Sequence, residues 1–235
     1  MADALQHSVL EALEGARNYN AWVAALVAPY LGDDPIEIGS GTGTYAEQWL
    51  ESGIPRLTVT DLDPALVDRL RERFSDDPRV TVESLDLLDA PRSDHSALVA
   101  LNVFEHIEDD VAGFASAARL VRPGGAVVAF VPAFKFAMSR FDRAIGHFRR
   151  YTMGTARQAM TDAGLDVEEV RYVNAPGLVA WTVGMRLLRM SPREGVALRT
   201  WDRAVVPAAR RIESRWRPPF GQSVLAVART PMLLH

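Results

Sequence analysis

Short apolar runs alternate with amphipathic runs between residues 35 and 131 of this chain. The apolar runs are rich in β-branched residues and as long as typical strands, whereas the runs between them repeat apolar residues at helical spacing. The predicted strands are residues 35–38, 56–61, 79–83, 97–102 and 126–131, and the predicted helices are residues 44–52, 64–74 and 109–121. Strands separated by helices require right-handed crossovers, so the pattern predicts a mostly parallel sheet covered by helices on both faces.

The pattern changes on either side of this alternating region. The further predicted elements are N-terminal helices within residues 5–31, a helix over residues 152–160, and strands at residues 167–173 and 223–228. Residues 176–217, between the last two strands, are predicted to form a helical insertion whose first part is strongly apolar. No repeat or low-complexity linker interrupts the chain, so one domain of residues 1–235 is expected.

The composition fits a single domain with a sizeable core. At 235 residues and 48% hydrophobic content, the chain lies at the upper end of one-domain size. It has no cysteine, which excludes disulfides and thiolate-bound metals and suits a reducing cytosol. Neither a signal peptide nor an apolar run of about twenty residues is evident, so a cytoplasmic protein without a membrane span is expected, with surface association still open. A net charge of −4 gives no general attraction to nucleic acid, and none is expected as a partner.

A glycine-rich stretch follows the first predicted strand. Glu37 lies in the predicted strand, just before this stretch. The run Gly39-Ser40-Gly41-Thr42-Gly43 then leads directly into the next predicted helix. Glycines at a strand-to-helix turn let a ligand lie directly on the main chain. The carboxylate of Glu37 suits a cationic ligand better than a phosphate. A tight turn that binds nothing is the alternative interpretation.

An acidic residue, Asp61, ends the second predicted strand about eighteen residues after Gly43. A carboxylate at this position can accept both hydroxyls of a ribose, as in dinucleotide-binding folds. The dinucleotide-binding loop, however, is spaced G-x-G-x-x-G, whereas this loop is spaced G-x-G-x-G and follows an acid. The combination favours a nucleoside with a positive charge, and a nicotinamide-dependent oxidoreductase remains the rival at the level of the fold.

These motifs resemble those of class I S-adenosylmethionine-dependent methyltransferases, and the resemblance covers residues 19–228. The matching segments are residues 37–43 for the first motif, Asp61 for the ribose-binding acid, residues 85–87 for the adenine segment, residues 102–107 after the fourth strand, and residues 122–125 before the fifth. One departure lies at the start of the fourth strand. The family usually has an acid there, whereas this chain has His95, with Asp94 one residue early.

The resemblance implies a Rossmann-like fold with a mostly parallel seven-stranded sheet, an antiparallel edge strand, helices on both faces and N-terminal lid helices. It also implies S-adenosyl-L-methionine as the cofactor. The residues that it assigns to cofactor binding are Tyr19, Glu37, Gly39, Ser40, Gly41, Gly43, Asp61, Leu62, Asp86, Leu87, Asn102, Val103 and His106. For His106, support of the adenosine side is favoured over proton transfer.

The run Gly146-His147-Phe148-Arg149-Arg150-Tyr151 follows the fifth strand, so its loop is expected over the mouth of the site. It looks like the run found in one subgroup of the family, many of whose members act on small molecules. His147 is the candidate general base, because imidazole exchanges protons near neutral pH. Arg150 is a candidate clamp for an anionic group, as is Arg149, and Tyr151 a candidate for orienting the substrate. The alternative is that these side chains only hold the loop, with Asp142 as their salt partner.

No spacing of histidines and acids typical of a metal site is present, so no metal is expected. The predicted reaction is methyl transfer to a small-molecule acceptor by in-line displacement, with oxygen favoured over nitrogen or carbon. The alternatives are a protein that binds S-adenosylmethionine for another reaction, and a regulatory binding module.

The predicted insertion leaves its own role open. Between residues 186 and 217 it has nine arginines against Glu194, Asp202 and Glu213. A helical cap with solvated arginines is one interpretation. A lid over a hydrophobic or anionic substrate, or a contact for a membrane surface or a partner, is the other. The oligomeric state is not readable from the sequence.

Overall fold

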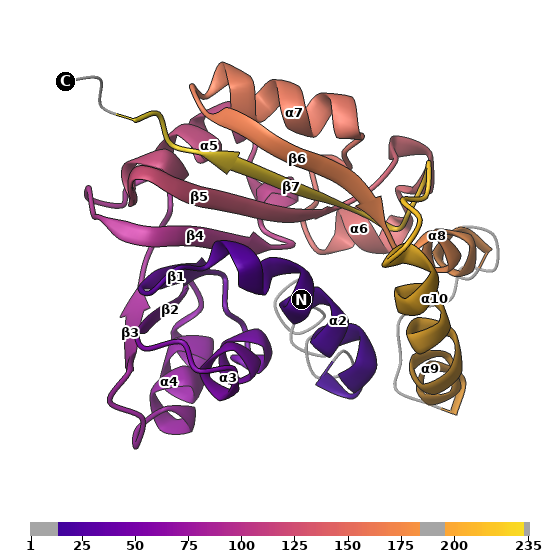
Figure 1. Cartoon of the computed structure of the whole chain (residues 1–235), viewed down its shortest axis with the longest axis horizontal. Coiled ribbons are helices and arrows are strands. Elements are labelled where there is room, and N and C mark those ends of the chain that lie inside the picture. Colours follow the sequence, from indigo (N-terminus) through magenta and orange to yellow (C-terminus); the bar gives the residue numbers. More distant parts are fainter. Residues whose placement is uncertain (1–13, 184–195, 233–235) are drawn as a thin grey trace.

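The computed structural model describes residues 14–183 and 196–232. One sheet runs through it in the strand order β3-β2-β1-β4-β5-β7-β6 (Figure 1). The strands are β1 (Pro35–Ile38), β2 (Leu57–Asp61), β3 (Val80–Ser84), β4 (His95–Leu101), β5 (Val121–Pro132), β6 (Asp166–Val173) and β7 (Ser223–Arg229). All seven predicted strands are confirmed. β5 begins five residues before its predicted start, and the other strand ends agree to within two residues.

The direction of the strands agrees with the expected mixed sheet. β1 pairs in parallel with both β2 and β4, and β2–β3 and β4–β5 are also parallel. β7 is antiparallel to both of its neighbours, β5 and β6, so the antiparallel pairing occurs at this end of the sheet, as predicted. The strand order reverses between β1 and β4. Ligands of open parallel sheets bind at such a reversal, outside the carboxyl ends of the strands.

Helices cover both faces of the sheet (Figure 1). The α-helices are α2 (Arg17–Val27), α3 (Thr44–Glu51), α4 (Pro64–Arg73), α5 (Asp110–Arg119), α6 (Arg140–Ala144), α7 (Met153–Asp162), α8 (Ala175–Trp181), α9 (Val196–Thr200) and α10 (Val206–Glu213). Shorter turns are η1 (Ala28–Tyr30), η2 (Phe104–His106), η3 (Lys135–Ala137) and the π-helical η5 (Trp201–Val205). Thr152 caps α7 with a reciprocal capping box, as the sequence predicted.

Two apolar clusters fill the spaces between the layers. Phe114 of α5 and Met160 of α7 belong to the cluster on one face of the sheet. Trp22 of α2, Trp49 of α3 and Leu70 of α4 belong to the cluster on the other face. Because both faces of the central strands are covered, β4 and β5 are almost entirely buried, which explains their continuous apolar sequences.

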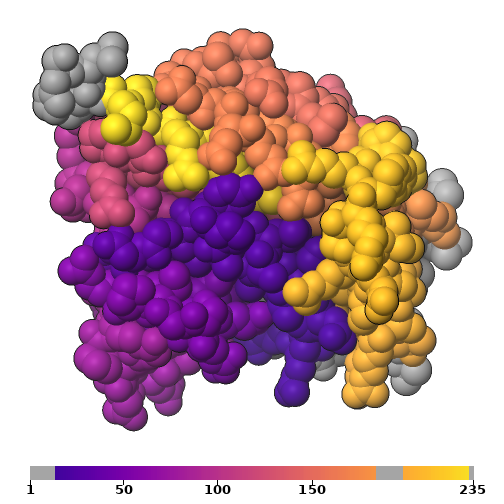
Figure 2. Space-filling model, in the orientation of Figure 1, coloured from indigo at the N-terminus to yellow at the C-terminus, as the bar shows by residue number. Residues whose placement is uncertain are grey.

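The helical insertion packs against the N-terminal part of the chain through Asp202. Asp202 of η5 is buried, and its carboxylate accepts hydrogen bonds from the backbone N–H groups of Asn18 and Tyr19 at 3.1 and 2.9 Å. Figure 2 shows the corresponding surfaces in contact, the insertion in orange to yellow and α2 in indigo. Residues 184–195 of the predicted insertion and residues 5–13 of the predicted lid lie outside the described residues. Within the described part of the chain, no helix is long and apolar enough to cross a membrane.

Candidate functional site

The carboxyl ends of β1, β2 and β4 converge at the point where the strand order reverses. Asp61, at the end of β2, accepts a hydrogen bond from the backbone N–H of Gly41 at 2.9 Å, which ties it to the loop after β1. Gly39 lies against the segment after β4, because a Cβ added there would come within 2.8 Å of Val103 Cγ2. The predicted loop, acid and post-β4 segment therefore meet at one edge of the sheet.

The glycine loop needs glycine for two different reasons. Gly39 has a φ of +67° and Gly43 a φ of +80°, a region that side-chain-bearing residues rarely adopt. A Cβ on Gly43 would also come within 2.8 Å of the ring of Phe74. Gly39 is exposed beside the strand ends, whereas Gly43 lies buried against α4. Of the two, only Gly39 offers its main chain to a ligand.

Glu37 is a buried carboxylate directly beneath this loop. Its side chain is 1% exposed, and its Oε2 atom has no hydrogen-bond partner among the described residues. Burial raises the pKa of Glu37 to about 8, the contact with Ser40 lowers it, and the charge of Asp61 raises it further. Tyr45 of α3 lies close enough to Glu37 and Tyr19 for each to affect its ionisation. Tyr45 was not anticipated from the sequence, because an aromatic residue at helical spacing is more often simply core.

Replacing Glu37 with glutamine is expected to prevent the decrease in free energy of unfolding that ionisation of Glu37 causes as the pH rises. The folded pKa is about 8 and the unfolded pKa about 4.3, so protonated Glu37 stabilises the fold fully below pH 4 and loses this effect as the pH rises through 8. The variant should gain on the wild type in free energy of unfolding by up to a few kcal/mol between about pH 4 and about pH 9. Denaturant titrations at both pH values measure this, with the exposed Glu47→Gln as the control. Equal pH profiles for wild type and Glu37→Gln would contradict the assignment.

The chemistry of these side chains fits a positively charged nucleoside. Glu37 supplies a buried carboxylate that a cationic group would satisfy. Asp61 Oδ2 and Oδ1 each accept one backbone N–H, from Gly41 and Asp63, and each oxygen retains a lone pair that can accept a ribose hydroxyl. S-Adenosylmethionine has both features, a sulfonium with an ammonium group and a ribose, so the residues present fit this cofactor.

The remaining predicted cofactor residues divide into exposed and buried groups. Leu62, Asp86 and Asn102 are exposed at the ends of neighbouring strands, and Leu62 is 61% exposed, which is unusual for a leucine. Leu87 is only 4% exposed and belongs to the core cluster under α5. The accessible member of the predicted adenine segment is therefore Asp86.

Two other predicted residues serve the fold directly. Ser40 is buried and joins β1 to β2 through its hydroxyl, which accepts the N–H of Thr60 at 3.1 Å and donates to the carbonyl of Glu37 at 3.3 Å. The hydroxyl of Tyr19 bonds to Ser223 at the start of β7, and burial raises the pKa of Tyr19 to about 12. Tyr19 therefore anchors α2 to the sheet beside the site.

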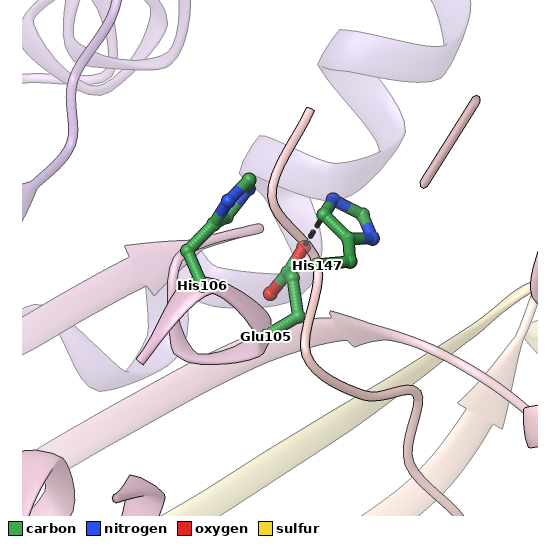
Figure 3. A group of neighbouring side chains, drawn as sticks. All are labelled: Glu105, His106 and His147. Carbon is green, nitrogen blue, oxygen red and sulfur yellow. Dashed lines mark ion pairs between the residues drawn. The ribbon is translucent and has the colours of Figure 1, made fainter. Parts of the chain in front are cut away.

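A second group of polar side chains lies where η2 meets the loop after α6 (Figure 3). Glu105 of η2 is fully buried, and its Oε1 atom lies 3.9 Å from Nε2 of His147. The ring of His106 meets that of His147 edge to face, with 4.5 Å between the ring centres. Burial, with the neighbouring His147, lowers the pKa of His106 to about 4, so this imidazole is neutral at neutral pH. The prediction placed His106 and His147 separately, and the structure brings them together.

Asp142 holds His147 from its other side. Its Oδ1 atom lies 3.2 Å from His147 Nδ1 and 2.7 Å from Arg150 Nη2. Its Oδ2 atom accepts hydrogen bonds from the backbone and hydroxyl of Ser139 at 2.6 and 2.7 Å. Burial raises the pKa of Asp142, but the contacts with His147, Arg150 and Ser139 outweigh it and hold this pKa below its usual range. Asp142 therefore carries a negative charge beneath the imidazole.

The structure directs Arg150 and Tyr151 inward, which differs from the roles expected for them. The guanidinium of Arg150 is 3% exposed, bonds to Asp142 and to the carbonyl of Ala133, and lies 4.9 Å from the ring centre of Trp181. The hydroxyl of Tyr151 donates to Asp110 Oδ2 at 2.9 Å, and the residue is 1% exposed. Neither side chain is accessible for clamping a substrate, because both are enclosed by protein partners. The geometry favours the alternative stated for this motif, namely holding the loop.

A surface cavity of about 440 Å³ opens beside this loop. Its lining residues are Lys135, Phe136, Met138, Arg143, His147 and Phe148. Phe136 and Phe148 are each more than half exposed, as expected for rings that contact a ligand rather than the core. The cavity combines an apolar wall with two cationic side chains, and His147 connects it to the buried acids.

Comparison with known proteins agrees with this geometry. Residues 36–127 match a family model described as a methyltransferase domain. A probable S-adenosylmethionine-dependent methyltransferase of Mycolicibacterium smegmatis is 28% identical over 179 residues, which is 73% of this chain and 68% of that protein. Ribosomal RNA small subunit methyltransferase A of Parasynechococcus marenigrum is 35% identical over 81 residues, which is 34% of this chain. The chain thus spans only 27% of the length of that second relative.

A solved structure shares the architecture over nearly the whole length. It is a chain of the complex between the Haloferax volcanii Trm112 methyltransferase activator and the putative methyltransferase. The TM-score is 0.64, and the superposition covers 94% of this chain and 93% of that chain at 18% identity. At this identity the likeness shows the fold, and it confirms the Rossmann-like arrangement predicted from the sequence.

Proposed function

We propose that this chain is an S-adenosylmethionine-dependent methyltransferase, a proposal supported by its match to a methyltransferase domain, and that it transfers a methyl group from S-adenosylmethionine to a hydroxyl oxygen of a small-molecule acceptor. The observation that carries the proposal is the convergence of Glu37, the glycine loop and Asp61 at the reversal of strand order. When bound, the cofactor supplies an activated methyl group on a sulfonium. The residues of the chain bind, orient and shield the reactants.

The cofactor side of the site follows from the strand ends. Asp61 is proposed to hold the ribose hydroxyls, and the exposed main chain at Gly39 to support the methionine part. Exposed Leu62 and Asp86 are proposed to contact the adenine. Three further cofactor contacts are proposed just after β4, at Asn102, Val103 and His106.

The acceptor side is proposed to be the cavity lined by His147. Lys135 and Arg143 suit an acceptor with an anionic group, and Phe136 and Phe148 suit an apolar body. His147 Nδ1 faces Asp142, which leaves Nε2 as the nitrogen that can take a proton from the acceptor hydroxyl. Arg150 and Tyr151 are proposed to act through the loop that they hold rather than by contact with the acceptor.

Incubation of a host metabolite extract with the protein and trideuteromethyl-labelled cofactor tests the reaction. A product heavier by one labelled methyl group is expected, and its fragmentation identifies the methylated atom. A labelled oxygen supports the proposal, and a labelled nitrogen or carbon overturns its choice of atom. If the protein binds the cofactor and no extract yields a labelled product, the alternative of a regulatory or non-methylating protein is favoured instead.

An RNA acceptor is the second candidate, because several relatives are ribosomal RNA small subunit methyltransferases. The segment shared with the relative from Parasynechococcus marenigrum is 34% of this chain, and the net charge of −4 provides no general attraction to RNA. The same labelled assay with deproteinised small-subunit ribosomal RNA separates the two. Label in RNA, and none in metabolites, would select this candidate.

Replacing Asp61 with alanine is expected to weaken binding of S-adenosylmethionine by about 10- to 100-fold. Hydrogen bonds to a charged group contribute about 1.5–3 kcal/mol, and the variant loses those to the ribose. Isothermal titration calorimetry measures the affinity, and circular dichroism verifies that the fold is retained. Asp68→Ala, at an exposed position of α4, is the matched control and should bind as the wild type does. Unchanged affinity in Asp61→Ala would remove the ribose assignment.

A further inference from the structure

We propose that Glu105, His106 and His147 bind one divalent transition-metal ion of the zinc type. One potential ligand atom from each residue lies within 4.8 Å of the other two, and all three side chains point toward one another (Figure 3). Two imidazoles and one carboxylate form a ligand set that zinc uses in sites with an open fourth position. The binding itself is independent of the proposed function, and only its consequence for catalysis rests on that function.

The observation that points to an ion is the state of Glu105. Its side chain is fully buried, and neither carboxylate oxygen has a hydrogen-bond partner among the described residues. Burying an unpaired carboxylate is costly, so such a group pairs with a cation, coordinates a metal or keeps its proton, and burial raises the pKa of Glu105 to about 8. The shortest approach to it within the cluster is the 3.9 Å between Oε1 and His147 Nε2, a separation that a bridging ion can close with a small shift.

The outer contacts of both imidazoles support this arrangement. His147 Nδ1 faces Asp142 at 3.2 Å, and His106 has a hydrogen bond with the backbone of Ile145. Each ring thus has one nitrogen beside an acceptor, by a hydrogen bond in His106 and by the 3.2 Å approach to Asp142 in His147, and a second nitrogen left for the ion. Histidine ligands of metals almost always have such an outer partner, which fixes the ring and its tautomer.

The charges of the cluster also suit a divalent ion. Burial raises the pKa of Glu105 to about 8, so this group is mostly protonated at neutral pH, and the charges of Asp142 and Arg150 cancel. Binding of a divalent ion displaces that proton and leaves the cluster with one net positive charge when both histidines are neutral. An anionic oxygen in the open position, such as an ionised hydroxyl of the acceptor, then makes the whole group neutral.

The ion would give the acceptor oxygen a new way to lose its proton. Because His147 lines the cavity, an acceptor bound there lies within reach of the ion. Coordination makes the hydroxyl more acidic, and its proton leaves to solvent rather than to His147. The oxygen then forms a bond to the methyl carbon while the carbon–sulfur bond breaks, and the bonding electron pair stays on sulfur.

Metal binding is measured directly on the untagged, chelator-treated full chain. His7→Ala/His235→Ala serves as the background, so that terminal histidines cannot contribute. Titration with Co²⁺ should give the visible absorption of a four-coordinate site and one equivalent of bound metal by mass spectrometry. Zn²⁺ should displace the Co²⁺ and abolish the absorption.

Variants locate the site on these residues. Glu105→Gln and His106→Gln should each lose stoichiometric binding, whereas His95→Gln, on the far end of β4, should keep it. Asp142→Asn should weaken binding by about 10- to 100-fold through loss of the outer contact. Circular dichroism verifies that each variant is folded. If Glu105→Gln or His106→Gln does not fold, His147→Gln is tested in its place. No bound Co²⁺ in the background protein, or equal binding by folded Glu105→Gln, overturns the proposal.

Activity separates this proposal from the proposed function. If metal-free protein transfers the labelled methyl group at the full rate, the ion has no part in catalysis and methyl transfer stands. If protein that binds both Co²⁺ and cofactor labels no acceptor, the methyltransferase proposal fails while the metal site stands.

Discussion

Replacement of Arg150 with alanine is expected to lower the free energy of unfolding by about 3–5 kcal/mol, because it breaks a buried ion pair from one side. The guanidinium is 3% exposed and Asp142 1% exposed, so the lost charge is not replaced by solvent. The variant would leave the buried carboxylate of Asp142, whose pKa is held below its usual range, without its guanidinium partner. It would also remove the cation from the ring of Trp181. Chemical denaturation at neutral pH measures the loss.

Arg149 provides a control at the next position of the same motif. Its side chain is 28% exposed and pairs with Asp110, which is itself partly exposed. Solvent can screen that pair, so Arg149→Ala should cost about 1 kcal/mol or less. If the two alanine variants were equally stable, burial would not distinguish the two arginines and the structural role assigned to Arg150 would be wrong.

Replacement of His147 with alanine is expected to reduce turnover by about 10²–10⁴-fold, the usual contribution of a positioned proton acceptor. His147 lines the cavity, and its ring also lies beside the buried side chains of Glu105 and Asp142. Binding of S-adenosylmethionine should be unchanged, because the strand ends that are proposed to hold it are not altered. Single-turnover kinetics with a labelled acceptor measure the methyl-transfer step separately from binding.

The pH dependence and metal dependence of the rate define what His147 does. If His147 accepts a proton, the methyl-transfer rate of the wild type falls at acidic pH, and this fall is absent in His147→Ala. If His147 binds a metal ion, the methyl-transfer rate of the wild type falls when a chelator is added and recovers with Zn²⁺, and His147→Ala shows neither change. His95→Ala is the control for loss of a histidine. Retained turnover across the pH range would make His147 a structural residue.

The meeting of the residues proposed to bind the cofactor was largely predictable, because these residues are close in sequence to the ends of strands. Parallel strands bring their carboxyl ends to one edge, so Gly39, Asp61 and Asn102 could be placed together from the order of the elements alone. Leu87 shows the limit of this reasoning. A position after a strand can face the core or the ligand, and packing under α5 directs Leu87 to the core.

The arrangement proposed for the acceptor side was less predictable, because it depends on contacts between distant segments. The sequence singled out His147, Arg150 and Tyr151 as one motif, but it did not say which of them faces solvent. The fold decides this, since Arg150 and Tyr151 find their partners inside, at Asp142 and Asp110. It also explains why no metal site was expected, because His106 and His147 are far apart in sequence and no fixed spacing links them.

Two levels of information therefore specify this protein. The periodicity of apolar residues, the glycine loop and the acid at the end of β2 predicted the sheet and the order of its layers, because these depend on local geometry and on the regular crossover of strands. The same region, residues 36–127, matches a methyltransferase domain. Only the tertiary structure decided that Glu105 and the two histidines share one buried space. That arrangement arises when the loop after β5 folds back over η2, and the position of such a loop is set by its packing rather than by its own sequence pattern.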